Sequence, residues 1–157
     1  MQQNINFLQQ AIELAYTNAE KGGRPFGALV VRDGQVIAQA VNEIITTNDP
    51  TAHAELLAIR AASQHLGSAS LAGCSVFASG HPCPMCMGAM RLAAIKEVTY
   101  AYSNEDGAPY GLSTAEIYAD LARPFAEQSM TIRHVPTRLA ARPDLYAHWK
   151  HQEQKGA

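Results

Sequence analysis

The chain has 157 residues, 47% of them apolar, which is enough to bury one hydrophobic core without disulfide bonds. Twelve lysines and arginines stand against 14 aspartates and glutamates, so the composition gives no sign of a broad basic surface for phosphate backbones. Three cysteines, an odd number, exclude a disulfide framework and favour a reduced, cytoplasmic protein, and no apolar run is long enough to span a membrane.

The first forty residues predict a helix followed by a β-hairpin. Apolar residues recur every three or four positions from Ile5 to Ala19, which is the spacing of one helical face. Two apolar segments, Gly27–Arg32 and Gln35–Val41, then flank Asp33-Gly34, a dipeptide that suits the positive φ angles of a two-residue turn. These segments are therefore expected to form two antiparallel strands.

Helices and strands alternate after the hairpin. A turn at residues 48–51 ends in Thr51, a residue suited to cap the next predicted helix, at residues 52–65. The elements that follow are a buried strand, a helix and a further strand, predicted at residues 74–79, 84–94 and 97–102. Strands joined through a helix in this way are expected to lie parallel in one sheet.

The last third of the chain predicts two helices and an extended segment. The helices are expected at residues 113–121 and 143–151, the extended segment at 130–135, and a flexible tail from Gln152 onward. No repeat or long linker divides the chain. The elements together predict a single domain over residues 1–157 with an α/β fold, in which helices cover a mixed sheet.

Four residues in two short motifs carry the predicted chemistry. His53 and Glu55 belong to a His-Ala-Glu triplet near the start of the second predicted helix, and Cys83 and Cys86 belong to a Cys-x-x-Cys motif. Pro84 fits the first position of the third predicted helix, which makes Cys83 the expected N-cap. At that position the unpaired backbone N–H groups and the helix dipole favour a thiolate, the form of cysteine that binds metal.

A catalytic zinc site is predicted from three candidate ligands, His53, Cys83 and Cys86. Cys74 begins a buried strand and is expected only to pack in the core. A structural zinc site closes with four protein ligands, but three ligands leave the fourth position for water. Zinc activates that water near neutral pH, and Glu55 can take and return its proton. Residues two apart on a helix point about 200° from each other, so His53 and Glu55 can converge only at a helix end. The predicted reaction is hydrolytic deamination; a redox or structural role is the alternative for an isolated Cys-x-x-Cys.

The combined pattern of His-x-Glu and Pro-Cys-x-x-Cys resembles the signature of the zinc deaminases in the cytidine deaminase-like superfamily. Within it, residues 24–28 (Arg-Pro-Phe-Gly-Ala), 48–55 (Asn-Asp-Pro-Thr-Ala-His-Ala-Glu) and 82–89 (Pro-Cys-Pro-Met-Cys-Met-Gly-Ala) resemble the small bacterial guanine deaminases. The resemblance runs from about Asn4 to Tyr102. It implies one CMP/dCMP-type deaminase domain, built as a three-layer α/β/α sandwich around a mixed five-stranded sheet, with one Zn²⁺ per subunit.

The resemblance also implies a substrate and partners. The implied reaction converts guanine to xanthine and ammonia, a step of purine catabolism, and the implied base pocket includes Phe26, Asn42 and the amide of Ala54. Thr114 stands at the position where these relatives hold an acidic residue against the guanine N1 and amino edge. The small-molecule base is the expected partner, together with a second copy of the chain that exchanges C-terminal segments; neither nucleic acid nor a membrane is expected.

Three features depart from the guanine deaminase pattern. His81 stands where a Glu usually precedes Pro-Cys, and it is expected to hydrogen-bond beside the ligands instead of binding the metal. Thr114 is not acidic, and the tail ends in Lys155-Gly156-Ala157 without an aromatic residue. The substrate alternatives are adenosine in transfer RNA, another aminopurine, a pterin, cytosine or a nucleoside. A structural zinc module without chemistry is the alternative outside the enzymes.

Overall fold

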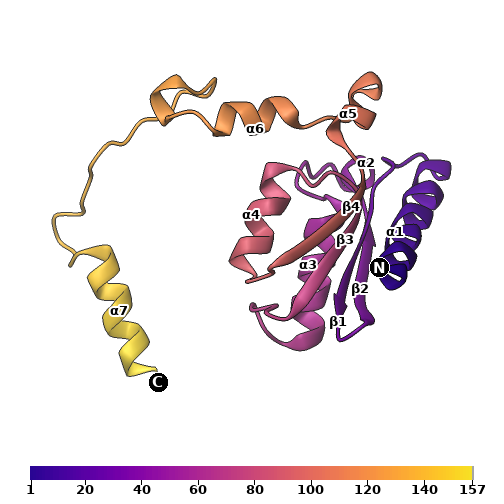
Figure 1. Ribbon diagram of the computed structural model, residues 1–157. Coiled ribbons are helices and arrows are strands. Elements are labelled where there is room, and N and C mark those ends of the chain that lie inside the picture. The colour runs from indigo at the N-terminus through magenta and orange to yellow at the C-terminus, as the bar shows by residue number, and fades with distance from the viewer. Residues whose placement is uncertain (157) are drawn as a thin grey trace. The chain divides into compact units, whose positions relative to one another are not determined.

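The structure is a computed structural model that describes residues 1–156, and it divides into two compact units. The first unit, residues 1–122, contains the sheet, and the second begins at Arg123 (Figure 1). Within the described residues the sheet has four strands, in the order β2-β1-β3-β4. That residues 1–157 form a single deaminase domain stays a prediction.

The predicted hairpin follows the first helix, α1 (Gln2–Glu20). Its strands, β1 (Gly27–Arg32) and β2 (Gln35–Val41), pair antiparallel and have the predicted bounds. The turn residues Asp33 and Gly34 have φ angles of 51° and 74°. Two successive positive φ angles give the turn the twist of the strands that it joins, which explains why Asp-Gly forms it.

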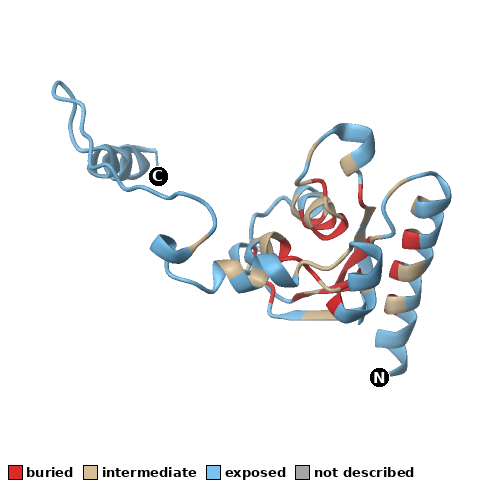
Figure 2. Ribbon diagram, turned by 90° about the horizontal axis from the view of Figure 1, so that it is seen from above, coloured by how far each residue is buried: buried red, intermediate tan, exposed pale blue. Residues whose placement is uncertain are grey.

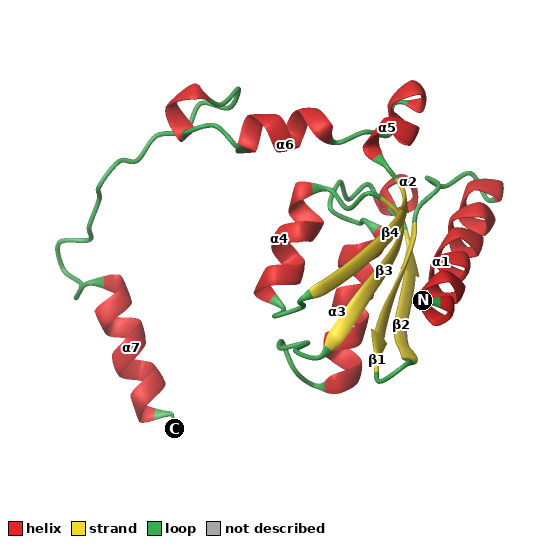
Figure 3. Ribbon diagram, viewed as in Figure 1, coloured by secondary structure: helices red, strands yellow, loops and turns green. Residues whose placement is uncertain are grey.

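Helices and strands then alternate as predicted. The elements are α3 (Ala54–Leu66), β3 (Cys74–Gly80), α4 (Pro84–Leu92) and β4 (Glu97–Tyr102) (Figure 3). β3 pairs antiparallel with β1 and parallel with β4, so the sheet is mixed. Because β3 and β4 are parallel, their carboxyl ends lie together, and Gly80 stands opposite Tyr102. The segment that leads into α4 starts from this end of the sheet.

Helices cover both faces of the sheet, which gives three layers (Figures 1 and 2). Successive residues of β1 point to opposite faces. Ala28 and Val30 belong to the larger core cluster, together with buried residues of α3 and α4. Leu29 and Val31 belong to a second cluster, which α1 covers with Phe7. The predicted α/β/α layering is therefore present in the first unit.

Short helices complete the first unit. They are α2 (Ile44–Thr47), α5 (Asn104–Gly107), the 3₁₀ helix η1 (Ala108–Tyr110) and α6 (Ala115–Leu121). α6 lies within the helix predicted at residues 113–121. α2 was not predicted, because four residues are too few for an apolar repeat to appear in the sequence.

The prediction of a fifth strand is wrong for the described residues. Residues 130–135 were predicted to be extended, but they carry no strand, and the sheet ends at β4. Met130, Ile132 and Val135 suit a strand, yet they are 70%, 38% and 72% exposed. A suitable pattern produces a strand only where a neighbouring strand supplies hydrogen bonds and packing.

The second unit contains the 3₁₀ helix η2 (Phe125–Glu127) and α7 (Leu145–Lys155). α7 confirms the helix predicted at residues 143–151, and the Asp144 carboxylate caps it by accepting hydrogen bonds from Tyr146 N–H and Ala147 N–H, both at 3.2 Å. α7 continues through residues 152–155, the start of the predicted flexible tail. The flexibility of the tail stays a prediction, and Ala157 lies outside the described residues. Among residues 1–156, no helix has both the length and the apolar character needed to cross a bilayer.

Candidate metal centre

His53 lies at the N-terminus of α3, as its N-cap residue. The preceding turn is held by the Asp49 carboxylate, which accepts hydrogen bonds from the N–H and the hydroxyl of Thr51 at 2.8 and 2.7 Å. Because Thr51 donates to this turn instead of capping the helix, α3 starts at Ala54, two residues later than predicted. His53 therefore sits at the helix end, where its side chain can converge with that of Glu55.

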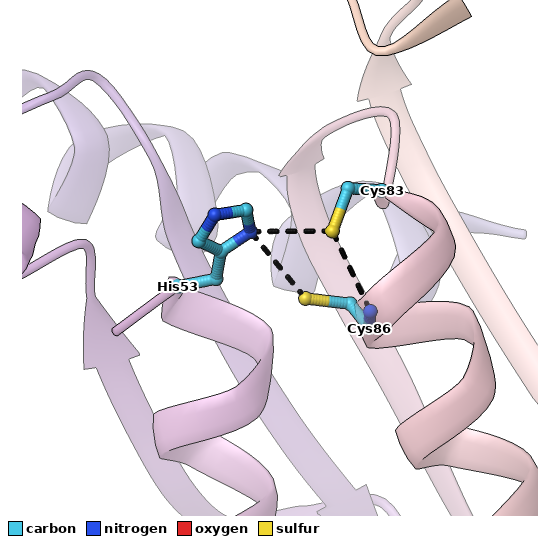
Figure 4. A group of neighbouring side chains, drawn as sticks. All are labelled: His53, Cys83 and Cys86. Carbon is cyan, nitrogen blue, oxygen red and sulfur yellow. Dashed lines mark hydrogen bonds between the residues drawn. The ribbon is translucent and has the colours of Figure 1, made fainter. Parts of the chain in front are cut away.

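Cys83 and Cys86 lie in the first turn of α4. As predicted, Cys83 is the N-cap and Pro84 the first helical residue. The sulfur of Cys83 accepts a hydrogen bond from Cys86 N–H at 3.5 Å. This bond keeps the Cys83 sulfur against the start of the helix, beside the sulfur of Cys86 (Figure 4).

The imidazole of His53 faces both sulfurs (Figure 4). Its Nδ1 lies 3.3 Å from the Cys83 sulfur and 3.6 Å from the Cys86 sulfur. Ligands at ~2.0–2.3 Å from a tetrahedral zinc ion are separated by about 3.3–3.8 Å, so both distances fit such an ion. One imidazole nitrogen and two thiolates are also donors that zinc prefers. The three predicted ligands thus form a group positioned to bind a metal ion.

Glu55, the predicted proton carrier, lies beside this group. It is the second residue of α3, and it is only 7% exposed. The Cys86 sulfur lies 3.7 Å from its Oε2 atom. Burial raises the pKa of the Glu55 carboxyl group above its usual value. Its position beside the three ligands suits a group that moves a proton, and the raised pKa makes its carboxylate a better proton acceptor.

The two cysteines share one negative charge when no metal is bound. Hydrogen bonds from the Cys86 thiol and from His53 lower the pKa of Cys83 to about 4, despite its burial. The pKa of Cys86 is raised, because its thiol proton is held by Cys83 and because the side chain is buried. The hydrogen bond to Cys83 in turn raises the pKa of His53. A metal ion at this position replaces these protons, so its binding releases protons.

The loop before β1 and the end of β2 are held together at the predicted substrate residues Phe26 and Asn42. Asn42 N–H donates to the Phe26 carbonyl at 3.1 Å, and the Asn42 side-chain oxygen accepts from Ile44 N–H at 3.1 Å. The side chain of Asn18, on α1, donates to the carbonyls of Arg24 and Asn42 at 2.7 and 2.9 Å. Asn18 was not predicted, since nothing distinguishes it from other polar residues of that helix.

A cavity of about 640 Å³ lies at the carboxyl ends of β3 and β4. Its wall includes Phe26 and His81, together with the rings of Tyr16, Tyr102 and Tyr110. The three residues of the metal group do not line it, and neither do the predicted substrate residues Asn42, Ala54 and Thr114. Of the residues predicted around the substrate, the structure therefore brings Phe26 and His81 to this cavity.

Ala54 and Thr114 both lie at helix starts. Ala54 is the fully buried first residue of α3, where backbone N–H groups have no partner within the helix. Thr114 is the N-cap of α6, and its N–H donates to the side-chain oxygen of Asn104 at 3.1 Å. The Thr114 hydroxyl oxygen is buried without a hydrogen-bond partner in the described part of the chain. The backbone N–H groups at the start of α3 and the Thr114 hydroxyl can therefore form hydrogen bonds with a ligand.

His81 lies two residues before Cys83, among aromatic rings. Its ring centroid is 4.7 Å from that of Tyr100 and 5.5 Å from that of Tyr118. The Nδ1 atom of His81 is buried and has no hydrogen-bond partner within residues 1–156. Its predicted hydrogen-bonding role beside the ligands stays a prediction. Tyr118, whose hydroxyl donates to the Pro82 carbonyl, was not predicted, because it belongs to no motif.

Comparisons with known proteins place His53, Glu55, Cys83 and Cys86 in a region that matches one protein family. Residues 1–102 match the family described as the cytidine and deoxycytidylate deaminase zinc-binding region. The chain is 42% identical over 130 residues to guanine deaminase of Bacillus subtilis, which covers 82% of this chain and 83% of that protein. It is 40% identical over 95 residues to the tRNA-specific adenosine deaminase of Aquifex aeolicus, and this match covers 60% of this chain and 63% of that protein. The crystal structure of Bacillus subtilis guanine deaminase matches with a TM-score of 0.81 and 37% identity, over 97% of this chain and 93% of that chain.

Proposed function

Because this chain belongs to the cytidine and deoxycytidylate deaminase family, we propose that it acts on a free nucleobase and converts guanine to xanthine and ammonia. The chain is a zinc-dependent hydrolytic deaminase. One observation carries the proposal for the site. His53, Cys83 and Cys86 surround one position, and Glu55 lies 3.7 Å from the Cys86 sulfur.

We assign His53 Nδ1 and the sulfurs of Cys83 and Cys86 as the zinc ligands. When bound, zinc acts as a Lewis acid and makes water a nucleophile near neutral pH. The N-terminus of α4 favours thiolates at these cysteines, because its N–H groups and dipole stabilise negative charge. Three protein ligands leave one coordination position for water, which distinguishes a catalytic site from a closed structural one. A structural zinc module is therefore disfavoured.

Glu55 is assigned as the group that moves protons. Its carboxylate takes one proton from the attacking water and delivers it to the ring nitrogen beside the amino-bearing carbon. The second water proton follows the same route to the departing amine. A C–O bond forms, the C–N bond breaks, one water is consumed and one ammonia leaves. Burial of Glu55 favours transfer to the substrate, because bulk water has little access to the carboxyl group.

Four further groups are assigned to the base. The Phe26 ring supplies an apolar face, and the Asn42 amide is held in place by the bond from Ile44 N–H to its oxygen. The N–H of Ala54 lies at the helix start next to His53. The buried Thr114 hydroxyl, without a partner in the described residues, can accept or donate a hydrogen bond at the base edge.

Two observations favour a free base over transfer RNA. The net charge of −2 gives no sign of a surface for phosphate backbones. The match to guanine deaminase also covers 82% of this chain, whereas the match to the tRNA-specific enzyme covers 60%. The proposed reaction belongs to purine catabolism, and we place it in the cytoplasm, where free cysteines such as Cys74, Cys83 and Cys86 stay reduced.

Ammonia release by the zinc-loaded protein tests the proposed substrate. We expect guanine to be turned over at least about 100-fold faster than adenine or cytosine, because a site built to hydrogen-bond a base edge rejects bases without that edge. Preferred turnover of cytosine or a pterin would instead make His81 and Thr114 markers of another specificity. Turnover of transfer RNA, with binding that weakens steeply as salt rises, would replace the free-base proposal.

We also propose that the protein forms a homodimer by exchanging C-terminal segments. The residues from 123 onward hold many exposed large apolar side chains, which are unfavourable in water. They are Phe125, Met130, Ile132, Val135, Leu139, Leu145, Tyr146 and Trp149. In the first unit, β4 is an edge strand whose Tyr100 and Tyr102 are 40% and 51% exposed. A second copy that supplies its C-terminal segment would bury both apolar surfaces.

Light scattering of the full chain tests the dimer. We expect a mass of twice 16.9 kDa at micromolar concentration. Trp149→Ser removes a large apolar side chain from α7 and is expected to shift the protein toward monomer. His151→Ser is the matched control, because His151 is an exposed polar residue of the same helix. A monomeric wild-type protein, or equal dissociation of both variants, would contradict the proposed exchange.

A further inference from the structure

The two residues before Cys83 are held by hydrogen bonds to two other elements. His81 N–H donates to the Tyr102 carbonyl, at the end of β4, at 2.8 Å. Pro82 is fully buried and has no N–H, so its carbonyl is its only backbone polar group. The hydroxyl of Tyr118, in α6, donates to that carbonyl. A buried carbonyl thus finds its partner in a side chain 36 residues farther along the chain.

Aromatic packing fixes the position of Tyr118. Its ring contacts the His81 ring with centroids 5.5 Å apart and planes inclined by 60°, an arrangement that aromatic pairs favour. The Tyr118 side chain is partly buried, and burial raises the pKa of its hydroxyl above the usual value. The hydroxyl therefore keeps its proton at neutral pH, and it remains a donor to Pro82.

The bond to the Pro82 carbonyl also constrains Cys83. The carbonyl of Pro82 and the N and Cα atoms of Cys83 belong to one planar peptide unit. Fixing the direction of the carbonyl therefore fixes the plane from which the Cys83 side chain starts. Cys83 has φ −71° and ψ 166°, and in this conformation its sulfur faces Cys86 N–H and His53 Nδ1.

We propose that Tyr118 is a positioning residue of the metal centre, whose hydroxyl holds the Pro82 carbonyl and thereby aims the Cys83 sulfur at the metal position. The proposal rests on the assignment of Cys83 as a zinc ligand. Tyr118 acts through Pro82 and not on the substrate. Partners that orient metal ligands commonly change metal affinity about 10- to 100-fold when they are lost, and an effect of this size is expected here.

Tyr118→Phe tests the proposal, because it removes the hydroxyl and keeps the ring that contacts His81. Tyr100→Phe is the matched control, since Tyr100 is the second ring on His81 and no hydrogen bond from its hydroxyl to this loop is found within residues 1–156. Zinc affinity is measured by competition with a chromophoric chelator. The absorption spectrum of the cobalt-substituted proteins reports sulfur–metal bonding, and thermal unfolding of the zinc-free proteins reports the fold.

We expect Tyr118→Phe to bind zinc about 10- to 100-fold more weakly, with altered sulfur-to-cobalt bands, while Tyr100→Phe matches the wild type. Wild-type affinity and spectrum in Tyr118→Phe would overturn the proposal. Equal losses in both variants would show that the effect does not depend on the bond to the Pro82 carbonyl. Failure of Tyr118→Phe to fold would assign Tyr118 to general stability. Either result also overturns the proposal. Failure of the wild type to bind zinc through Cys83 would instead overturn the proposed site.

A carbonyl resonance gives an independent measurement. Pro82-Cys83 is the only Pro-Cys dipeptide in the sequence, so protein with ¹³C-carbonyl proline and ¹⁵N cysteine has one peak that correlates the two labels. The Pro82 carbonyl resonance is expected to shift in Tyr118→Phe and to stay in place in Tyr100→Phe. An unchanged resonance in Tyr118→Phe would show that the hydroxyl does not hold this carbonyl.

Discussion

The Glu55→Gln variant is expected to release ammonia about 100- to 10,000-fold more slowly than the wild-type protein, the range found when a general acid–base group is lost. Glutamine has nearly the same shape but cannot carry a proton between water, ring nitrogen and leaving amine. Glu55 is not a proposed ligand, so zinc content is expected to stay unchanged. Steady-state ammonia assays and metal analysis of the same preparations measure both quantities.

Glu13→Gln is the matched control for this substitution. Glu13 is exposed on α1, so the same chemical change there should leave both turnover and zinc content unchanged. If Glu55→Gln kept more than a tenth of the wild-type turnover, the proton-carrying role would have to move to another group. If the variant lost zinc as well as activity, Glu55 would be needed to hold the metal, and the division between ligands and proton carrier would be wrong.

Elements determined by neighbouring residues were predictable from the sequence. The hairpin is right to the residue, because Asp33 and Gly34 adopt the positive φ angles that make an Asp-Gly turn. The cap of α4 is right for a similar reason, since Pro84 at the first helical position leaves Cys83 as N-cap. The metal group followed from two such local features, once both motifs were assigned to helix starts.

Features that depend on distant partners were not predictable. Residues 130–135 have an apolar pattern suited to a strand, but the pattern cannot say whether a neighbouring strand is present. The start of α3 was misplaced for a local reason instead, because the Thr51 hydroxyl has two possible roles and donates to Asp49 rather than capping the helix. The bond from Tyr118 to Pro82 spans 36 positions, and nothing near either residue indicates it. The groups that contact the base also come from distant parts of the chain, so the sequence alone does not predict them.

Cys86→Ser is expected to leave the protein with almost no zinc and with ammonia release at the background rate. The Cys86 sulfur is fully buried and lies 3.6 Å from His53 Nδ1. A serine hydroxyl stays protonated near neutral pH and does not replace a thiolate as a zinc ligand. With two ligands left, the site neither holds the metal firmly nor presents it to water. Zinc analysis of the purified protein and steady-state assays measure the two losses.

Cys74→Ser separates loss of the ligand from loss of packing. Cys74 is also buried, at 3% exposure, but it belongs to the core and not to the metal group. Both substitutions place a hydroxyl in a buried site, so both are expected to lower the melting temperature. Only Cys86→Ser should remove zinc and activity, because only Cys86 faces His53. If both variants lost zinc, the cause would be a damaged fold; if neither did, Cys86 would not be a ligand.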